Sequence, residues 1–241
     1  QCCTSHEAST SLSSAPDHHP ITGAVTQLFR SIGAGYRGGI QNLHGRLPCA
    51  TISRHPHPFA SFRTTRARRL LGLLFHRVIR NFMIQAGDST SRHAQPGQML
   101  GEADRSYTLA PEFRTPTHYH RRGALAAARE SDDVNPGRRS SATQFYVVWG
   151  KRWTPNELAN VREHVDAETG ENGLITDNMA LDYYTRGGSP HLDGQYTVFG
   201  EVLTGLEVIE KIQGVNTDRN DRPRIDVRIV SARIIPTAPP Q

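Results

Sequence analysis

Phe75-His-Arg-Val-Ile-Arg-Asn-Phe-Met-Ile-Gln-Ala-Gly-Asp88 is the stretch that decides the fold. Its apolar runs, Val78-Ile79 and Phe82-Met-Ile84, favour extended backbone and are separated by the polar Asn81. The end of the stretch, Ala86-Gly-Asp88, is typical of a turn, because Gly and Asp tolerate the backbone angles that turns require. We therefore predict strand structure up to this turn.

Short apolar segments continue downstream of this stretch. We expect further strands at residues 107–109, 123–128, 144–149, 196–199 and 227–235. Aromatic and β-branched residues dominate 144–149, and the apolar residues of 227–235 alternate with a period of two. Several short strands between Gly, Pro and Asp turns indicate an all-β barrel or sandwich.

Three helical segments interrupt the strands. Thr154-Pro-Asn-Glu157 is a capping box with proline at the first helical position, and it predicts an amphipathic helix to about residue 167. A short helix is expected at 177–185. A third is expected at 206–212, where apolar side chains recur on one helical face.

The charge of the chain is unevenly distributed. Residues 1–74 hold eight Arg and two acidic residues, whereas 75–241 hold 20 basic and 21 acidic residues. The nearly neutral part offers no Lys/Arg cluster with aromatic partners, so we expect no nucleic-acid partner.

No apolar run approaches the ~18 residues of a membrane span. His118 and His120 lack an evident third ligand, so we expect no metal.

Residues 1–69 show neither helical nor strand periodicity, and we predict that they are poorly structured. Cys2 and the Ser/Thr/His-rich stretch after it are compatible with a lipoprotein tether, which favours a bacterial periplasm or envelope over the cytoplasm. The alternative is an arbitrary overhang.

The abrupt change of character at Leu70 also suggests that the segment before it is a frame-shifted reading. Codons exist for residues 62–71 whose shift by one base reads Ser-Ala-Arg-Leu-Ala-Arg-Asp-Gly-Tyr. The alternative is a genuine, divergent extension. Sequencing the coding DNA around codons 70–73 separates the two readings, since an alternate frame without a matching start would end the hypothesis.

Four blocks, in order, resemble the cyclophilin family of peptidyl-prolyl cis-trans isomerases. Residues 75–88 resemble its Phe-His-Arg block with the following Phe-Met-x-Gln-Gly-Gly-Asp, and 123–129 resemble Gly-x-Leu-Ser-Met-Ala-Asn. Residues 141–146 resemble the Ser-Gln-Phe-Phe block, and 191–200 resemble Trp-Leu-Asp-Gly-x-His-x-Val-Phe-Gly. The chain is identified as a member on this joint order, because each residue alone could be barrel core or surface.

The resemblance implies an all-β fold with capping helices, built as a closed eight-stranded antiparallel barrel over 70–236. The family barrel begins with two strands and a helix before the Phe-His-Arg block. We see neither a strand pair nor an amphipathic helix in residues 1–70, so these N-terminal strands are expected to be missing or corrupted. A helical insertion at about 151–188 resembles that of bacterial, Bacteroidetes-like members.

The implied reaction is rotation about Xaa-Pro bonds, whose barrier of roughly 18–20 kcal/mol reflects amide resonance. No bond is made or broken, so no nucleophile, metal or cofactor is required. A fixed donor aimed at the prolyl nitrogen stabilises the twisted amide alone. By resemblance that catalytic donor is Arg77.

The resemblance also implies the substrate-binding residues. The slot for the proline ring is assigned to Phe82, Met83, Tyr146 and Leu192. Gln85 is assigned to the substrate backbone, Gln144 to a partner of the arginine, the backbone of Ala128 and Arg129 to the peptide edge, and His76 and Tyr196 to the pocket wall. His191 stands where many eukaryotic members have the Trp that binds cyclosporin.

Five positions depart from the family pattern, namely Ala86, Arg129, Tyr146, His191 and Tyr196. We expect proline-containing peptides and unfolded proteins as partners, weak cyclosporin binding and a monomer. The alternative function is a catalytically weak peptide-binding or chaperone module that uses the same groove.

Overall fold

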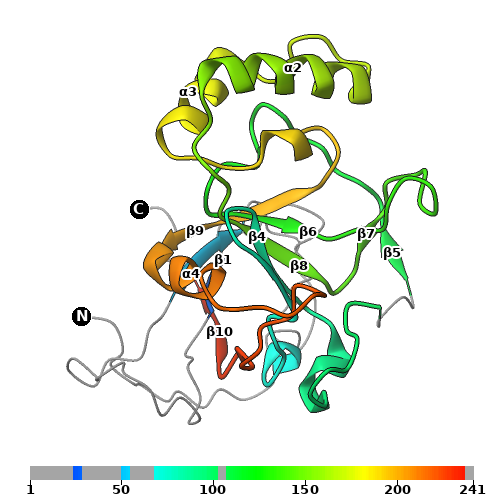
Figure 1. Ribbon diagram of the computed structural model, residues 1–241, viewed down its shortest axis with the longest axis vertical. Coiled ribbons are helices and arrows are strands. Elements are labelled where there is room, and N and C mark those ends of the chain that lie inside the picture. The colour runs from blue at the N-terminus through cyan, green and yellow to red at the C-terminus, as the bar shows by residue number, and fades with distance from the viewer. Residues whose placement is uncertain (1–23, 29–49, 55–67, 103–106, 237–241) are drawn as a thin grey trace, which may run out of the picture.

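The computed structural model (Figure 1) describes residues 24–28, 50–54, 68–102 and 107–236. The strands in these ranges are β1 (Ala24–Leu28), β2 (Ala50–Arg54), β3 (Arg77–Ile79), β4 (Met83–Ala86), β5 (Thr108–Leu109), β6 (Ala124–Ala127), β7 (Ser140–Ser141), β8 (Phe145–Val148), β9 (Val198–Thr204) and β10 (Ala232–Pro236). The helices are α2 (Pro155–Thr169), α3 (Asp177–Thr185) and α4 (Leu206–Gln213), with short 3-10 turns η2 (Arg68–Leu70), η3 (Ser89–His93) and η4 (Pro190–Leu192).

One antiparallel sheet dominates the described residues, with strand order β10-β1-β2-β9-β6-β8-β4-β3, and β5 pairs separately with β7. The two outer strands, β10 and β3, form no ladder with each other in these ranges. Instead, Leu74 and Arg228 form an isolated bridge, and Phe75 N donates to Val227 O at 2.9 Å. The predicted closed barrel is therefore wrong for the described structure. The expected strand at 227–235 becomes regular only from Ala232, which leaves no ladder to close the sheet.

Strands β1 and β2 lie in the segment where we expected no strand pair. β1 pairs with β10 and β2, and β2 also pairs with β9. That expectation is wrong for these ten positions, because five-residue strands are too short to show a period against their surroundings. The other residues of 1–67 lie outside the described ranges, so the tether and the frame shift stay predictions.

The central strands divide their side chains between two clusters. Alternate residues of β8 lie in different clusters, with Phe145 and Val147 in one and Tyr146 and Val148 in the other. This follows from the period of two along a strand. Both faces of β8 are covered, so all four residues are buried.

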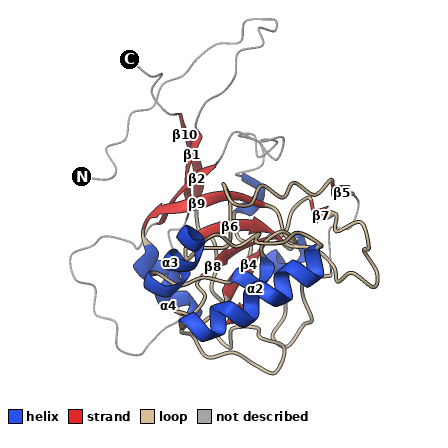
Figure 2. Cartoon of the chain, turned by 90° about the horizontal axis from the view of Figure 1, so that it is seen from above, coloured by secondary structure: helices blue, strands red, loops and turns tan. Residues whose placement is uncertain are grey.

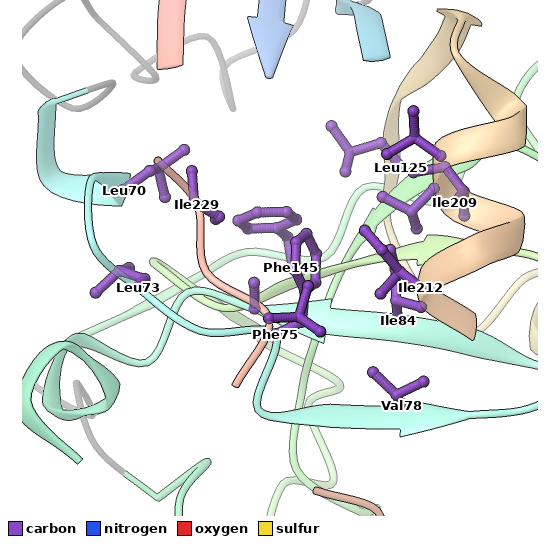
Figure 3. Close-up of a cluster of buried hydrophobic side chains, with 14 of the residues drawn as sticks. Leu70, Leu73, Phe75, Val78, Ile84, Leu125, Phe145, Ile209, Ile212 and Ile229 are labelled. Atoms are coloured by element: carbon purple, nitrogen blue, oxygen red, sulfur yellow. The ribbon is translucent and has the colours of Figure 1, made fainter. Parts of the chain in front are cut away.

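The first cluster is the main core, and α4 packs onto it. Figure 3 shows Ile209 of α4 beside Leu125 and Ile212 beside Ile84, with Phe75 and Phe145 in the middle of the cluster. The predicted helix at 206–212 is confirmed.

The helical insertion forms a third cluster of its own. Figures 1 and 2 show α2 and α3 together on one side of the sheet. The predicted capping box is confirmed, since the Thr154 and Glu157 side chains each accept from the other residue's backbone N–H. Gly188 N donates to Lys151 O at 3.0 Å, so the two ends of the insertion meet. Among the helices of the described ranges, none combines the length and apolarity that a bilayer crossing needs.

Candidate active site

A row of residues crosses four neighbouring strands and places the predicted site. Arg77 on β3 pairs with Gln85 on β4, Gln85 with Tyr146 on β8, and Tyr146 with Ala126 on β6. Residues paired directly across a sheet project from the same face. The row therefore brings Arg77, Gln85 and Tyr146 to one surface, although 69 positions separate the first from the last.

Arg77 lies at the exposed end of this row. Its side chain is 45% exposed, and its Nε lies 3.5 Å from Asp221 Oδ2. The backbone of Asp221 also accepts from Val78 N at 2.8 Å, which fixes the carboxylate beside β3. The guanidinium is thus reachable from solvent while one of its nitrogens is oriented. Sequence reasoning missed Asp221, which lies 144 positions downstream of Arg77.

The apolar residues predicted to hold the proline ring lie together. Met83, Tyr146 and Leu192 are buried in one cluster, and Phe82 and Tyr196 pack against it partly exposed. These residues come from β4, β8, η4 and the connecting segments. Side chains alternate along β4 and β8, so Met83 and Tyr146 project from the same face of the sheet. The arrangement provides an apolar surface one strand away from Arg77.

Two glutamines form the polar side of the site. Gln85 Nε2 donates to Gln144 Oε1 at 3.0 Å, and Gln144 Nε2 donates to Gly101 O at 2.8 Å. Beside them lies a cavity of about 300 Å³, whose lining includes Gln85, Gln144, Ala128 and Arg129. Gln85 therefore belongs to both the row and the cavity lining, where the two glutamines can contact a peptide backbone.

The predicted peptide edge is partly occupied by the chain itself. Ala128 N donates to Gln144 O at 3.0 Å, and Ala128 O accepts from Ser141 N at 2.8 Å. The Arg129 side chain is 3% exposed, with its guanidinium 4.3 Å from the centre of the Tyr196 ring. Arg129 thus supports Tyr196 from behind, a role that the sequence did not indicate.

His191 lies in an aromatic wall beside the apolar surface. Its ring centre is 5.5 Å from that of Phe82 and 6.2 Å from that of Trp153. The Trp153 indole N–H donates to Gly188 O at 2.8 Å. Burial lowers the pKa of His191 to about 4, so this ring is neutral at pH 7.

His76 is more deeply buried than a pocket-wall residue. Its side chain is 4% exposed, and the Gln144 side chain lies beside its ring. Burial lowers the pKa of His76 from 6.5 to about 4, although the charge of Asp88 opposes the shift. Arg77 and Arg222 add to the lowering.

Acid is expected to destabilise the protein through His76. Above about pH 6.5 the ring is neutral in both the folded and the unfolded chain, and it adds no pH dependence. Between pH 6.5 and 4 the unfolded chain binds a proton that the folded chain does not. The contribution of His76 to the free energy of unfolding should therefore fall over this window by up to about 3 kcal/mol and stay constant below it.

Urea unfolding of wild type and His76→Gln at pH 7 and pH 4.5 tests this expectation. The variant should lose less stability between the two pH values. His93→Gln, at an exposed position, serves as the matched control and should keep the wild-type slope. An unchanged slope in His76→Gln contradicts the assignment.

A buried hydrogen-bonded group behind Tyr146 escaped sequence reasoning. His120 is 1% exposed, and its Nε2 lies 3.0 Å from the Tyr146 hydroxyl, while its Nδ1 lies 2.9 Å from Asp193 Oδ1. The sequence placed His120 in a probable loop. The signal was Tyr146 itself, because a tyrosine in place of an apolar ring needs a partner for its buried hydroxyl. No group of three His, Cys, Asp or Glu suited to a metal occurs in the described ranges.

Known proteins resemble the chain over most of its length. A family model described as "Cyclophilin type peptidyl-prolyl cis-trans isomerase/CLD" matches residues 45–234. A Staphylococcus aureus protein named "Putative peptidyl-prolyl cis-trans isomerase" is 33% identical over 160 residues, which cover 66% of this chain and 71% of that protein. A Streptococcus pyogenes "Putative bifunctional phosphatase/peptidyl-prolyl cis-trans isomerase" is 32% identical over 167 residues, covering 68% of this chain and 30% of that protein.

Solved structures share the fold. The crystal structure of a cyclophilin type peptidyl-prolyl cis-trans isomerase from Cryptosporidium parvum matches with a TM-score of 0.52 at 18% identity, over 79% of this chain and 93% of that chain. A structure from the same organism, determined in the presence of the dipeptide Ala-Pro, matches with a TM-score of 0.51 at 18% identity, over 78% and 92%. The sequence matches and the structural matches agree with each other.

Proposed function

Because the chain belongs to the family of cyclophilin-type peptidyl-prolyl cis-trans isomerases, we propose that it accelerates rotation about Xaa-Pro bonds with Arg77 as its catalytic group. The observation that carries this proposal is the row of Arg77, Gln85 and Tyr146 across β3, β4 and β8. It aligns a reachable cation, an amide and an apolar surface on one face of the sheet.

The geometry supports a mechanism without covalent chemistry. A proline ring seated on Met83, Tyr146 and Leu192 places its nitrogen on the face that also carries Arg77. Twisting the amide localises a lone pair on that nitrogen, and the guanidinium donates to it only in the twisted state. Such differential binding lowers the barrier. Gln85 holds the substrate backbone while the amide turns.

The substrates proposed are proline-containing peptides and unfolded proteins. One of the structural neighbours was determined in the presence of Ala-Pro, the smallest unit of this chemistry. A protease-coupled assay on an Ala-Pro peptide tests the function. We expect a relaxation rate that rises in proportion to protein concentration, and a rate equal to the uncatalysed one would overturn the proposal.

A catalytically weak peptide-binding module is the second candidate. It is favoured by the Asp221 carboxylate, which lies 3.5 Å from Arg77 Nε and competes with a substrate for the guanidinium. In this case the protein binds an Ala-Pro peptide in a titration without accelerating its isomerisation. A monomer, a location in the envelope and the absence of a nucleic-acid partner remain our expectations.

Weak inhibition by cyclosporin is predicted from His191. The imidazole of His191 is smaller than an indole and would cover less of the apolar surface of the drug. Its N–H would also lie at a different position from the indole N–H. We expect His191→Trp to bind cyclosporin about tenfold more tightly than wild type, the equivalent of one hydrogen bond of about 1.4 kcal/mol. Titration of the drug against isomerase activity measures the difference.

His191→Phe is the matched control for this substitution. It restores an apolar ring without an N–H donor, so it should gain less affinity than His191→Trp. Equal cyclosporin affinities for wild type and His191→Trp would contradict the prediction.

A further inference from the structure

The Asp193 carboxylate is the centre of a buried polar group that the proposed mechanism does not use. Asp193 is 1% exposed. Its Oδ1 accepts from the backbone N–H of His120 at 2.8 Å and from His120 Nδ1 at 2.9 Å, and its Oδ2 accepts from the Tyr183 hydroxyl at 2.5 Å. Three donors satisfy the oxygens of this side chain, which is the condition for keeping a polar group in the interior.

The carboxylate favours one direction for each hydrogen bond. In the tautomer whose Nδ1 donates to Asp193, His120 Nε2 presents its lone pair. Nε2 lies 3.0 Å from the Tyr146 hydroxyl, which therefore donates. Burial raises the pKa of Tyr146 well above its ordinary value, with Tyr196 and Asp193 adding to the shift, so the hydroxyl keeps its proton.

The two ends of this chain of hydrogen bonds lie in different parts of the fold. Tyr183 is fully buried on α3, within the helical insertion. Tyr146 lies on β8, in the apolar cluster and directly across the sheet from Gln85. The Tyr146 ring is also bordered by Tyr196, whose centre is 6.1 Å away in an edge-on arrangement.

We propose that the hydrogen-bonded chain Tyr183–Asp193–His120–Tyr146 holds the Tyr146 ring in the position that receives the substrate proline. His120 and Tyr183 are then positioning residues, and the helical insertion contributes to the site through Tyr183. The inference deepens the proposed function of this pocket and rests on it.

The physical reason is the free-energy cost of leaving a buried hydroxyl without a hydrogen-bond partner. If Nε2 of His120 is removed, the Tyr146 hydroxyl loses its acceptor, which favours displacement of the whole ring towards water. That movement displaces the surface on which the proline ring sits. If the hydroxyl is removed as well, no unpaired group remains and the ring has no reason to move.

A double-mutant cycle tests this coupling with the Ala-Pro peptide as substrate. His120→Asn retains a side-chain donor for Asp193 at the position of Nδ1 and removes the acceptor for Tyr146. We expect His120→Asn to raise KM and lower kcat/KM about tenfold in the wild-type background, and less than twofold in the Tyr146→Phe background. Equal losses in both backgrounds would overturn the proposal, since a merely structural role of His120 acts in both.

A measurement that does not depend on activity separates this proposal from the proposed function. The flip rate of the Tyr146 ring, measured by NMR on protein with ¹³C-labelled tyrosine, should increase in His120→Asn; an unchanged rate would overturn the proposal. A wild-type protein without isomerase activity would refute the proposed function, while the ring-flip comparison still decides the hydrogen-bonded chain.

Tyr183→Phe tests whether the helical insertion affects the position of the Tyr146 ring. This variant leaves Asp193 two donors, so it is expected to fold even if His120→Asn does not. KM should rise about threefold and the Tyr146 ring should flip faster. Tyr184→Phe, which alters the neighbouring and exposed tyrosine of α3, is the matched control and should leave both unchanged. Identical behaviour of the two variants would contradict the coupling.

Discussion

Arg77→Ala is expected to lower kcat/KM by about 2–4 kcal/mol of transition-state stabilisation, roughly 30- to 900-fold. The expectation follows from a donor that acts only on the twisted amide. Because the Arg77 side chain is 45% exposed, its removal leaves no cavity, and the free energy of unfolding should stay close to that of wild type. Isomerase assays with chemical denaturation measure the two quantities separately.

Two control variants sharpen this test. Arg77→Lys should recover little activity, because an ammonium on a flexible stem cannot replace the planar guanidinium. Arg80→Ala alters an exposed arginine of the same hairpin, which donates to Gly214 O at 3.0 Å, and should remain active. An Arg77→Ala protein with wild-type activity would end the assignment of Arg77.

Phe75→Ala is expected to lower the free energy of unfolding by about 3–5 kcal/mol. Phe75 is 1% exposed and lies in the middle of the main core, to which α4 contributes Val208, Ile209 and Ile212 (Figure 3). A loss of this size is a large part of the about 5–15 kcal/mol that stabilises a typical domain. Urea unfolding at pH 7 measures it.

Phe75→Leu is the control for this variant, since it keeps an apolar side chain and leaves a smaller cavity. Its cost should be clearly lower than that of Phe75→Ala. The site forms only in the folded protein, and Phe75 immediately precedes His76 and Arg77. Activity should therefore fall with the folded fraction in both variants. A cost below about 1 kcal/mol for Phe75→Ala would mean that this ring does not hold the core together.

Local signals in the sequence predicted the elements that depend on local contacts. The capping box at Thr154 and the strand around Phe145 are both present, because their causes lie within a few residues. Strands β1 and β2 were missed, since their order comes from pairing with β10 and β9. The closed barrel was wrong for the same reason, as closure depends on how distant segments meet.

In the candidate site too, the sequence predicted some residues and missed those whose role depends on distant contacts. Resemblance named the apolar residues around Met83 and Tyr146, and the structure brings them together, while their roles in binding stay predictions. It missed Asp193 and His120, which are 73 positions apart and acquire a joint role only through the fold. It also could not foresee that the Arg129 side chain is buried against Tyr196.

The meeting of Lys151 and Gly188 has a consequence for how such a chain diversifies. A segment that leaves and re-enters the sheet at one hydrogen-bonded point can be lengthened without moving the strands on either side. Lengthening it adds little closure entropy, because that cost grows only with the logarithm of loop length. Gly150 fixes the junction, since a side chain there would approach the Gly188 carbonyl group to 2.2 Å. The junction therefore serves as a grafting point, at which evolution or an engineer can install a new module beside the pocket.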